Sequence, residues 1–520
     1  MNNIFFNLVL HSHIPFVKKA GRWPFGEEWF FEAMLETYIP LTVLFYNLKE
    51  KGVDWHITLS VTPVLAEQLS DAYMLYEAEK YIEERIFLAE RDFYEFSKEN
   101  KKEAQLALFY KNLYKKMLDH FRNSFSRNLL KFWGELQRDG NLEILTSSAT
   151  HAYLPLLKKN SSIYAQLYIG KENYIKHFGS QPVGIWLPEC AYKPGLEKVL
   201  SELKFKYFFV DTHSILGGES LGYPEVKSSG KMRSILEPYY VDETEVIVFG
   251  RHERTSMQVW SAEWGYPGDG LYREFHKKAE TSGLQYWRIV SKNTDLGLKE
   301  IYDPEVAKNK ALEHASHFVS LLEEEGKREK GIITAMYDTE LFGHWWFEGL
   351  IFLERVYELI NESKIVKSTI PKLYLTYFEP NKKIYLPESS WGKGGKHEVW
   401  LNKDTEELWQ KIHSVEEIME EASEEKTDSL WKEKVLKQMA REKLLLESSD
   451  WPFLISTYQA REYGYKRFYQ HYENFSKLYS FLKIKEPKVE DFNLLKKLED
   501  TDSLFPNINY NIFRRRNYER

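Results

Sequence analysis

The chain has 520 residues and a net charge of −7, from 71 basic and 78 acidic side chains, and this interspersed balance argues against a nucleic-acid-binding surface. Its length allows two or three packed units around a large core. The single cysteine, Cys190, excludes an intramolecular disulfide, and no apolar run reaches membrane-spanning length; we therefore expect a soluble, cytoplasmic protein that binds neither membranes nor nucleic acids.

The first predicted element is a core strand over residues 4–10, which ends at His11-Ser12-His13-Ile14-Pro15. Side chains at positions i and i+2 of a strand lie on the same face. His11 and His13 can therefore point into one cavity at the end of this strand.

Strands and helices alternate along most of the remaining chain up to residue 390. We predict further strands at 55–61, 142–145, 183–187, 206–210, 239–250 (a hairpin turning at Asp242 and Glu243), 332–337 and 384–386. The Gly- and Ser-rich segment 214–234 predicts a mobile loop. Gln258-Val259-Trp260, with Trp264, Tyr266 and Asp269 close behind, predicts a polar, aromatic loop. Two regions are almost wholly helical instead: residues 66–140, which are too long for one crossover, and residues from about 404 to 500.

This order of elements predicts an α/β fold with a parallel sheet. Functional residue types follow six or more of the strands, which favours a barrel. We divide the chain into a first part of the barrel (1–65), a helical insertion (66–140), the remainder of the barrel with the active site (141–400) and a C-terminal helical domain (401–520).

Two predicted strands each end in a carboxylate with aromatic neighbours. Trp186-Leu187-Pro188 leads into Glu189, and Met336-Tyr337 leads into Asp338. Glycoside cleavage needs such a pair, because one carboxylate attacks or stabilises the sugar cation while the other protonates the leaving oxygen. A solvated glutamate at a strand end is the alternative for Glu189 taken alone. We expect Glu189 to be ionised at working pH and the pKa of Asp338 to be the raised one.

Four histidines, His11, His13, His151 and His213, follow predicted strands. They can hydrogen-bond a substrate, tune a proton, or form a site for zinc or another divalent metal together with an aspartate. A single histidine in such a position is more often a hydrogen-bonded core residue.

Aromatic residues are abundant, with 34 Tyr, 32 Phe and 15 Trp, and several tryptophans stand beside glycine or charged residues in a way that suits sugar rings. In Trp391-Gly-Lys-Gly-Gly395 the glycines allow a loop to approach a ligand closely. Trp400 either lines the same site or packs the start of the C-terminal helices. The stretch 449–453, Ser-Asp-Trp-Pro-Phe, either touches the active-site rim or forms an interhelical turn.

Together these stretches resemble glycoside hydrolase family 57, in particular its 1,4-α-glucan branching enzymes and intracellular α-amylases. The likeness rests on the segments 11–15, 186–192 and 337–349, with 391–400 and 449–453 adding to it, and so extends over essentially the whole chain. It implies an incomplete (β/α)7 barrel with a helical insertion and a C-terminal all-helical domain. It also implies an α-glucan partner such as amylose, glycogen or starch, and neither a cofactor nor a metal.

The resemblance further implies a retaining double displacement, with Glu189 as the nucleophile and Asp338 as the general acid/base. The residues that it implies for substrate binding are His11, His13, His151, Trp260, Trp391, Trp400 and Asp450.

One difference from branching members of that family lies between the nucleophile and the Gln258-Val259-Trp260 stretch. Those members carry a long lid with a catalytically important tyrosine there, whereas only about 70 residues separate Glu189 from Trp260 here. A lid that excludes water favours transfer to a sugar hydroxyl, so we expect substantial α-amylase-like hydrolysis. The alternatives are an efficient branching enzyme, a metal-dependent hydrolase or deacetylase that uses the histidines, and a non-catalytic glucan-binding protein.

Overall fold

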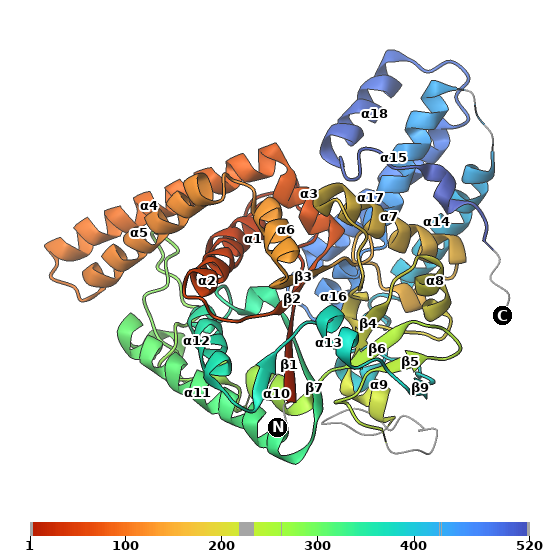
Figure 1. Ribbon diagram of the computed structural model, residues 1–520. Helices are drawn as coiled ribbons and strands as arrows, with labels where there is room; N and C mark the ends of the chain where they lie inside the picture. The colour runs from red at the N-terminus through yellow and green to blue at the C-terminus, as the bar shows by residue number, and fades with distance from the viewer. Residues whose placement is uncertain (1–3, 218–232, 262, 426, 428, 517–520) are drawn as a thin grey trace.

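The computed structural model describes residues 4–217, 233–261, 263–425, 427 and 429–516. Most of the segment predicted as a mobile loop, residues 218–232, lies outside this range. Within it, strands form the centre of the molecule and helices surround them (Figure 1). No helix of the described residues combines the length and the apolar character that a membrane span requires.

The first sheet has the strand order β3–β2–β1–β7, with every pair parallel and β8 added beside the start of β1. Its strands are β1 (Ile4–Ser12), β2 (Ile57–Val61), β3 (Leu142–Leu145), β7 (Gly331–Asp338) and β8 (Val366–Ser368). Most positions of β1 are buried on both faces, as is typical of a parallel strand covered by helices. The predicted first core strand is therefore the centre of the sheet.

The second sheet has the order β4–β6–β5–β9. Its strands are β4 (Tyr207–Val210), β5 (Tyr239–Val241), β6 (Ile247–Gly250) and β9 (Lys383–Ile384). The antiparallel pairing of β5 with β6 confirms the hairpin predicted over residues 239–250. The parallel pairing of β4 with β6 continues the direction of the first sheet.

Two isolated parallel bridges, Thr146 to Ile185 and Gly184 to Tyr207, connect the two sheets. The strand predicted at 183–187 is reduced to these bridges, because Gly184 lies directly against the Tyr207 ring and Pro188 ends the extended backbone. On the other side, the amide of His252 donates to the carbonyl of Thr334 in β7 at 2.8 Å. The ring of parallel positions is thus an incomplete (β/α)7 barrel, and the predicted α/β architecture is confirmed.

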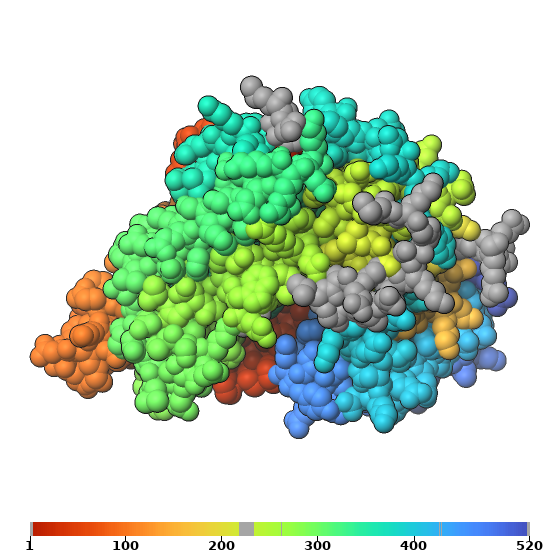
Figure 2. Space-filling view, turned by 90° about the horizontal axis from the view of Figure 1, so that it is seen from below, coloured from red at the N-terminus to blue at the C-terminus, as the bar shows by residue number. Residues whose placement is uncertain are grey.

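Helices fill the interval between β2 and β3, as predicted for residues 66–140. They are α3 (Pro63–Ser70), α4 (Ala72–Lys98), α5 (Glu103–Asp119) and α6 (Leu129–Asp139). Helices α4 and α5 form an antiparallel hairpin whose tip extends away from the rest of the molecule (Figures 1 and 2). Asp71 caps the start of α4 by accepting from the Met74 amide, and Gly140 ends α6 in the left-handed conformation.

The helices of the barrel lie outside the strands. They are α1 (Glu27–Ala33), α2 (Ile39–Glu50), α7 (Asn160–Phe178), α8 (Leu196–Glu202), α9 (Thr212–Leu216), α10 (Glu253–Trp260), α11 (Pro304–Arg328), α12 (Gly349–Glu362) and α13 (Pro371–Tyr377). A π-helical turn, Met34–Tyr38, joins α1 to α2. The loop predicted from Gln258 begins only after Trp260. Its first three residues were predicted wrongly, because they form the last turn of α10, which His252 caps by accepting from the Thr255 amide.

The C-terminal region is helical, as predicted. Its helices are α14 (Glu406–Glu424), α15 (Leu430–Leu446), α16 (Asp450–Ser456), α17 (Arg461–Phe481) and α18 (Val489–Thr501). Their apolar side chains share one buried cluster with the half of the barrel around Ile185 and Phe208. Seen from below, the C-terminal helices stand on one side of a hollow at whose base N-terminal residues are visible (Figure 2). This common core fixes the α15–α16 turn against the barrel.

Candidate active site

Three neighbouring strands end at one mouth of the barrel. In the β1–β7 pair His11 stands opposite Asp338, and on the other side of β1 it stands opposite Ser60 of β2. Just beyond, the hydroxyls of Ser12 and Thr339 lie 2.8 Å apart. The carboxyl ends of parallel strands are where α/β barrels place their chemistry. The strand register thus brings His11 and Asp338 to the same mouth.

Glu189 lies in a tight turn, Pro188–Cys190, that follows the bridged position 184–185. Its φ is 61°, in the left-handed region, which costs a non-glycine residue about 1 kcal/mol or more. Its Oε2 accepts from Trp391 Nε1 at 2.9 Å, and its Oε1 accepts from Ser449 Oγ at 3.0 Å. A strained turn therefore presents a carboxylate that is held from both the 391 loop and the C-terminal helices.

Both candidate catalytic carboxyls have raised pKa values. Burial raises the pKa of Glu189 to about 7; the hydrogen bond from Trp391 opposes this and the charge of Asp338 adds to it. Burial raises the pKa of Asp338 to about 6, against the opposing charges of Arg251 and His13. The expectation that Asp338 alone would be raised was wrong, because Glu189 lies in an equally dry setting and faces two further acids, Asp338 and Asp450. Between about pH 6 and about pH 7 the two carboxyls hold one proton together.

His11 and His151 are buried and bonded to each other. Their Nε2 atoms lie 2.9 Å apart. His11 is 2% exposed and His151 is 3% exposed. The second nitrogen of His11 lies 3.0 Å from Ser60 Oγ, and that of His151 lies 2.8 Å from Ser449 Oγ. Burial holds the pKa of both imidazoles well below its usual value. Every ring nitrogen of His11 and His151 is paired within the protein, and the contact of these two histidines with a sugar stays a prediction.

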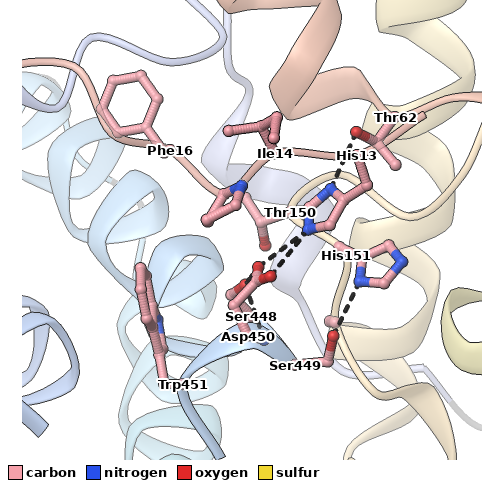
Figure 3. A network of polar contacts seen from close by, with 12 residues as sticks. His13, Ile14, Phe16, Thr62, Thr150, His151, Ser448, Ser449, Asp450 and Trp451 are labelled. Carbon is pink, nitrogen blue, oxygen red and sulfur yellow. Dashed lines mark hydrogen bonds and ion pairs between the residues drawn. The ribbon is translucent and has the colours of Figure 1, made fainter. Parts of the chain in front are cut away.

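His13 lies beside His151 in a different environment (Figure 3). Its ring stacks on that of His151 with 3.9 Å between ring centroids, and its Nε2 lies 3.0 Å from both carboxylate oxygens of Asp450. Its Nδ1 lies 3.1 Å from Thr62 Oγ1. Burial lowers the pKa of His13, but the charge and hydrogen bond of Asp450 raise it more, and the net shift is upward. Asp450 thus reaches the barrel mouth from the first turn of α16, so the stretch 449–453 is the start of this helix and contributes to the rim through Asp450.

The three predicted tryptophans have different positions. Trp391 contacts Glu189 directly and packs edge-on against Trp186. Trp260 is partly buried at the end of α10, 6.5 Å from the ring of Trp345, which is 42% exposed. Of these three, Trp391 is therefore the tryptophan that the structure joins to the candidate catalytic carboxyl of Glu189.

Trp400 is a correction to the predicted site. It is 1% exposed and stacks on Tyr153 with 4.4 Å between ring centroids. Its ring lies where a side chain on Gly392 would stand, since a Cβ there would be 2.6 Å from it. Trp400 therefore supports the 391 loop from behind and offers no free surface to a sugar.

The predicted metal set is brought together only in part. His13, His151 and Asp450 have ligand atoms within 4.8 Å of one another. The nitrogens of both rings are hydrogen-bonded to Thr62, Asp450, His11 and Ser449, so a metal bound here would have to displace some of these partners. His213 lies apart from this group, with its Nε2 3.2 Å from the carbonyl of Gly395.

Glu340 is a buried residue of the site that sequence reasoning missed. It accepts a hydrogen bond from the hydroxyl of Tyr38 in the π-helical turn and one from the His13 amide at 3.2 Å. Burial, with the charge of Asp338, raises its pKa to about 8. Its place two residues after Asp338, in the turn that follows β7, was the one available signal. Ser60 was missed as well, since a lone serine carries no pattern, whereas Ser449 was named only as part of the stretch 449–453.

Comparison with known proteins agrees with this geometry. A model of glycosyl hydrolase family 57 matches residues 7–387, and a model described as 1,4-alpha-glucan branching enzyme, C-terminal, matches residues 411–513. A 1,4-alpha-glucan branching enzyme of Thermococcus kodakarensis is 44% identical over 526 residues, which cover 96% of this chain and 77% of the relative.

Two solved structures have the same fold over nearly their whole length. The crystal structure of a family 57 branching enzyme from Thermococcus kodakaraensis matches with a TM-score of 0.92 and 42% identity, covering 99% of this chain and 97% of that chain. The α-amylase AmyC from Thermotoga maritima matches with a TM-score of 0.87 and 33% identity, covering 100% of both chains. The resemblance predicted from the sequence is confirmed: the chain is an enzyme that belongs to glycosyl hydrolase family 57, with a C-terminal region of the branching-enzyme type.

Proposed function

We propose that this enzyme is a 1,4-α-glucan branching enzyme that works by retaining double displacement. The observation that carries the proposal is the Glu189 carboxylate, which receives hydrogen bonds from Trp391 and Ser449 and is close enough to Asp338 for the charge of one to raise the pKa of the other. The match of residues 411–513 to the branching-enzyme C-terminal model supports branching as the outcome.

In this proposal Glu189 attacks the anomeric carbon and Asp338 protonates the leaving oxygen. The reaction needs one proton on the pair, and it must be on Asp338. The hydrogen bonds from Trp391 and Ser449 favour the ionised form of Glu189, but with them in place its pKa is still about 7, above the value of about 6 for Asp338. The shared proton must therefore move from Glu189 to Asp338 before the attack. Asp338 then acts as the base that activates the second acceptor when the glycosyl-enzyme is resolved.

The acceptor of that second step decides between branching and hydrolysis. The 6-hydroxyl of a glucan chain gives an α-1,6 branch, whereas water gives a shortened chain. The segment expected to act as a lid overlaps residues 218–232, outside the described residues, and its shortness motivates a competing hydrolytic activity. The 33% identity with the AmyC α-amylase over the full chain favours the same second activity.

The test is incubation of the full chain with amylose, followed by two product measurements. Chain-length analysis after debranching measures the number of α-1,6 branches, and a fall in iodine staining is a second sign of branching. Released reducing ends measure hydrolysis. Branches in excess of new reducing ends support branching as the main reaction. Reducing ends without branches identify an α-amylase and overturn it.

Two controls address the other classes. Glu189→Gln should abolish both products, and their persistence would remove Glu189 from the mechanism. Exhaustive treatment with a chelator should leave the wild-type rates unchanged, because the paired nitrogens of His13 and His151 leave no ready metal site. A loss of activity that returns with added zinc would instead support a metal-dependent hydrolase.

A further inference from the structure

Five side chains form one continuous line of hydrogen bonds that ends at the Glu189 carboxylate. The line is Ser60 Oγ to His11 Nδ1 (3.0 Å), His11 Nε2 to His151 Nε2 (2.9 Å), His151 Nδ1 to Ser449 Oγ (2.8 Å) and Ser449 Oγ to Glu189 Oε1 (3.0 Å). It begins on β2, crosses β1 and the segment after β3, and reaches Glu189 through the turn before α16. Three separate parts of the barrel and the C-terminal helices thus meet in it.

The donors in this line must all point the same way when Glu189 is ionised. A carboxylate only accepts, so the single hydroxyl hydrogen of Ser449 is directed at Glu189. Ser449 Oγ must then accept from His151, which places the proton of that ring on Nδ1 and leaves its Nε2 as an acceptor. His11 therefore carries its proton on Nε2, and its Nδ1 accepts from the Ser60 hydroxyl. Both rings are neutral, because burial holds the pKa of each well below its usual value.

We propose that Ser60, His11, His151 and Ser449 are positioning residues that act as one polarised hydrogen-bond chain to orient the Glu189 carboxylate. This deepens the proposed function, on which it rests, and assigns the two histidines a role behind the nucleophile in place of direct sugar binding. Ser60 is 0% exposed and Ser449 is 0% exposed, so neither serine can touch a substrate.

The surroundings of Glu189 show why a neutral chain is suited to this place. Asp338 from β7 and Asp450 from α16 both face it with like charge. Two cationic groups are nearby: His13 is paired with Asp450, and Arg251 lies 3.5 Å from Asp211. A row of dipoles directed at the carboxylate stabilises its charge without adding another ion, and neighbouring hydrogen bonds in a row strengthen one another. Removing any member should weaken the stabilisation that the others give.

The first experiment isolates the ionisation of Glu189. In an Asp338→Asn background, kcat/KM for an aryl α-maltotrioside with a good leaving group should rise with pH through a single midpoint set by Glu189. Adding Ser449→Ala should move that midpoint up by about one pH unit, and adding Ser60→Ala by about half a unit. In the presence of Ser449→Ala, the Ser60→Ala change should have no further effect, since the chain is already broken.

The matched control is Ser147→Ala. Ser147 is also fully buried near the end of a barrel strand, but its hydroxyl donates to the Trp186 carbonyl at 2.8 Å and has no part in the chain. It should lower stability without moving the midpoint. The hydrogen-bond chain would be disproved if Ser60→Ala moved the midpoint equally with and without Ser449→Ala, because residues that act separately give additive effects. It would also be disproved if Ser60→Ala did not move the midpoint at all.

The second measurement is made on the wild-type protein, and variants are used only to assign the signals. Long-range ¹H–¹⁵N spectra of the full chain labelled with ¹⁵N-histidine, taken above the midpoint and assigned with His11→Asn and His151→Asn, should show His11 protonated on Nε2 and His151 on Nδ1. The opposite tautomers, or a charged ring, would overturn the proposal. If Glu189→Gln keeps full activity, the proposed function itself fails. If Glu189→Gln is inactive but Ser60→Ala leaves the midpoint unmoved, only the proposed hydrogen-bond chain fails.

Discussion

Trp391 is bonded to Glu189 twice, through its indole Nε1 to the carboxylate at 2.9 Å and through its backbone amide to the Glu189 carbonyl at 3.0 Å. The backbone bond fixes the distance between the 391 loop and the strained turn, and the indole bond then orients the carboxylate. A change in this loop should therefore alter the chemistry of Glu189 as well as sugar binding.

Trp391→Phe keeps an aromatic ring and removes the indole donor. The pKa of Glu189, already about 7, should rise by about one unit, because a hydrogen bond to a charged group is worth about 1.5 kcal/mol or more. The shared proton would then lie on Glu189 more often, and kcat/KM at the optimum should fall about tenfold. Trp400→Phe is the control, since Trp400 is buried behind the loop; an equal loss of kcat/KM in both variants would contradict the prediction.

Asp338→Asn should change the shape of the pH profile. In the wild type, kcat/KM is expected to peak between about pH 6 and about pH 7, where the pair holds one proton. In the variant the fall on the alkaline side should disappear for a substrate with a good leaving group, because no acid is left to lose its proton. The remaining midpoint should lie below about 7, since the charge of Asp338 helps to raise the pKa of Glu189. A complete bell in this variant would identify another residue as the acid.

Glu189→Ala should lose activity by several orders of magnitude and regain turnover of an activated α-glucoside with added azide. Azide enters from the face that the carboxylate occupied, so the product should be the β-azide. In the intact enzyme, a fluoro-sugar should label the peptide that contains Glu189, which mass spectrometry can locate. An α-azide product, or a label on a different peptide, would exclude Glu189 as the nucleophile.

Glu36 should stabilise the fold in a way that depends on pH. It lies in the π-helical turn and accepts from Arg273 at 2.8 Å and from His344 at 3.0 Å. Burial opposes its charge, but Arg273 and His344 together lower its pKa from 4.5 to about 2. A lowered pKa means that this stabilisation is complete above about pH 4.5 and is lost as the pH falls towards about 2.

Glu36→Gln should therefore lower the free energy of unfolding at pH 7 by about 3 kcal/mol. The difference from the wild type should shrink as the pH is lowered from 4.5 towards 2, which urea unfolding at several pH values can follow. Glu50→Gln, at the exposed end of α2, should leave stability unchanged at every pH. A difference for Glu36→Gln that stays constant down to pH 2 would show that the ion pair does not set it.

The local pattern of the sequence was sufficient for the barrel and for the place of its two carboxylates. Alternating apolar runs that stop at His11, at Glu189 and at Asp338 show where strands end, and parallel strands necessarily bring those ends to one mouth. The same reasoning failed where local signals were weak. Residues 184–185 form only single bridges, and the polar stretch ending at Trp260 is helical because His252 supplies a cap that spacing alone does not reveal.

The tertiary structure alone decided which side chains surround the nucleophile. Ser449 and Glu189 are 260 residues apart, and His13 and Asp450 are 437 apart, so their contacts depend on how the C-terminal helices pack on the barrel. That packing pairs His151 with Ser449, and it brings Ser449 and Asp450 to Glu189, where both affect the pKa of its carboxyl. Strand ends follow from the residues next to them in the chain, whereas burial and pairing depend on groups from distant segments, and these set the desolvation and the charges that a carboxylate experiences.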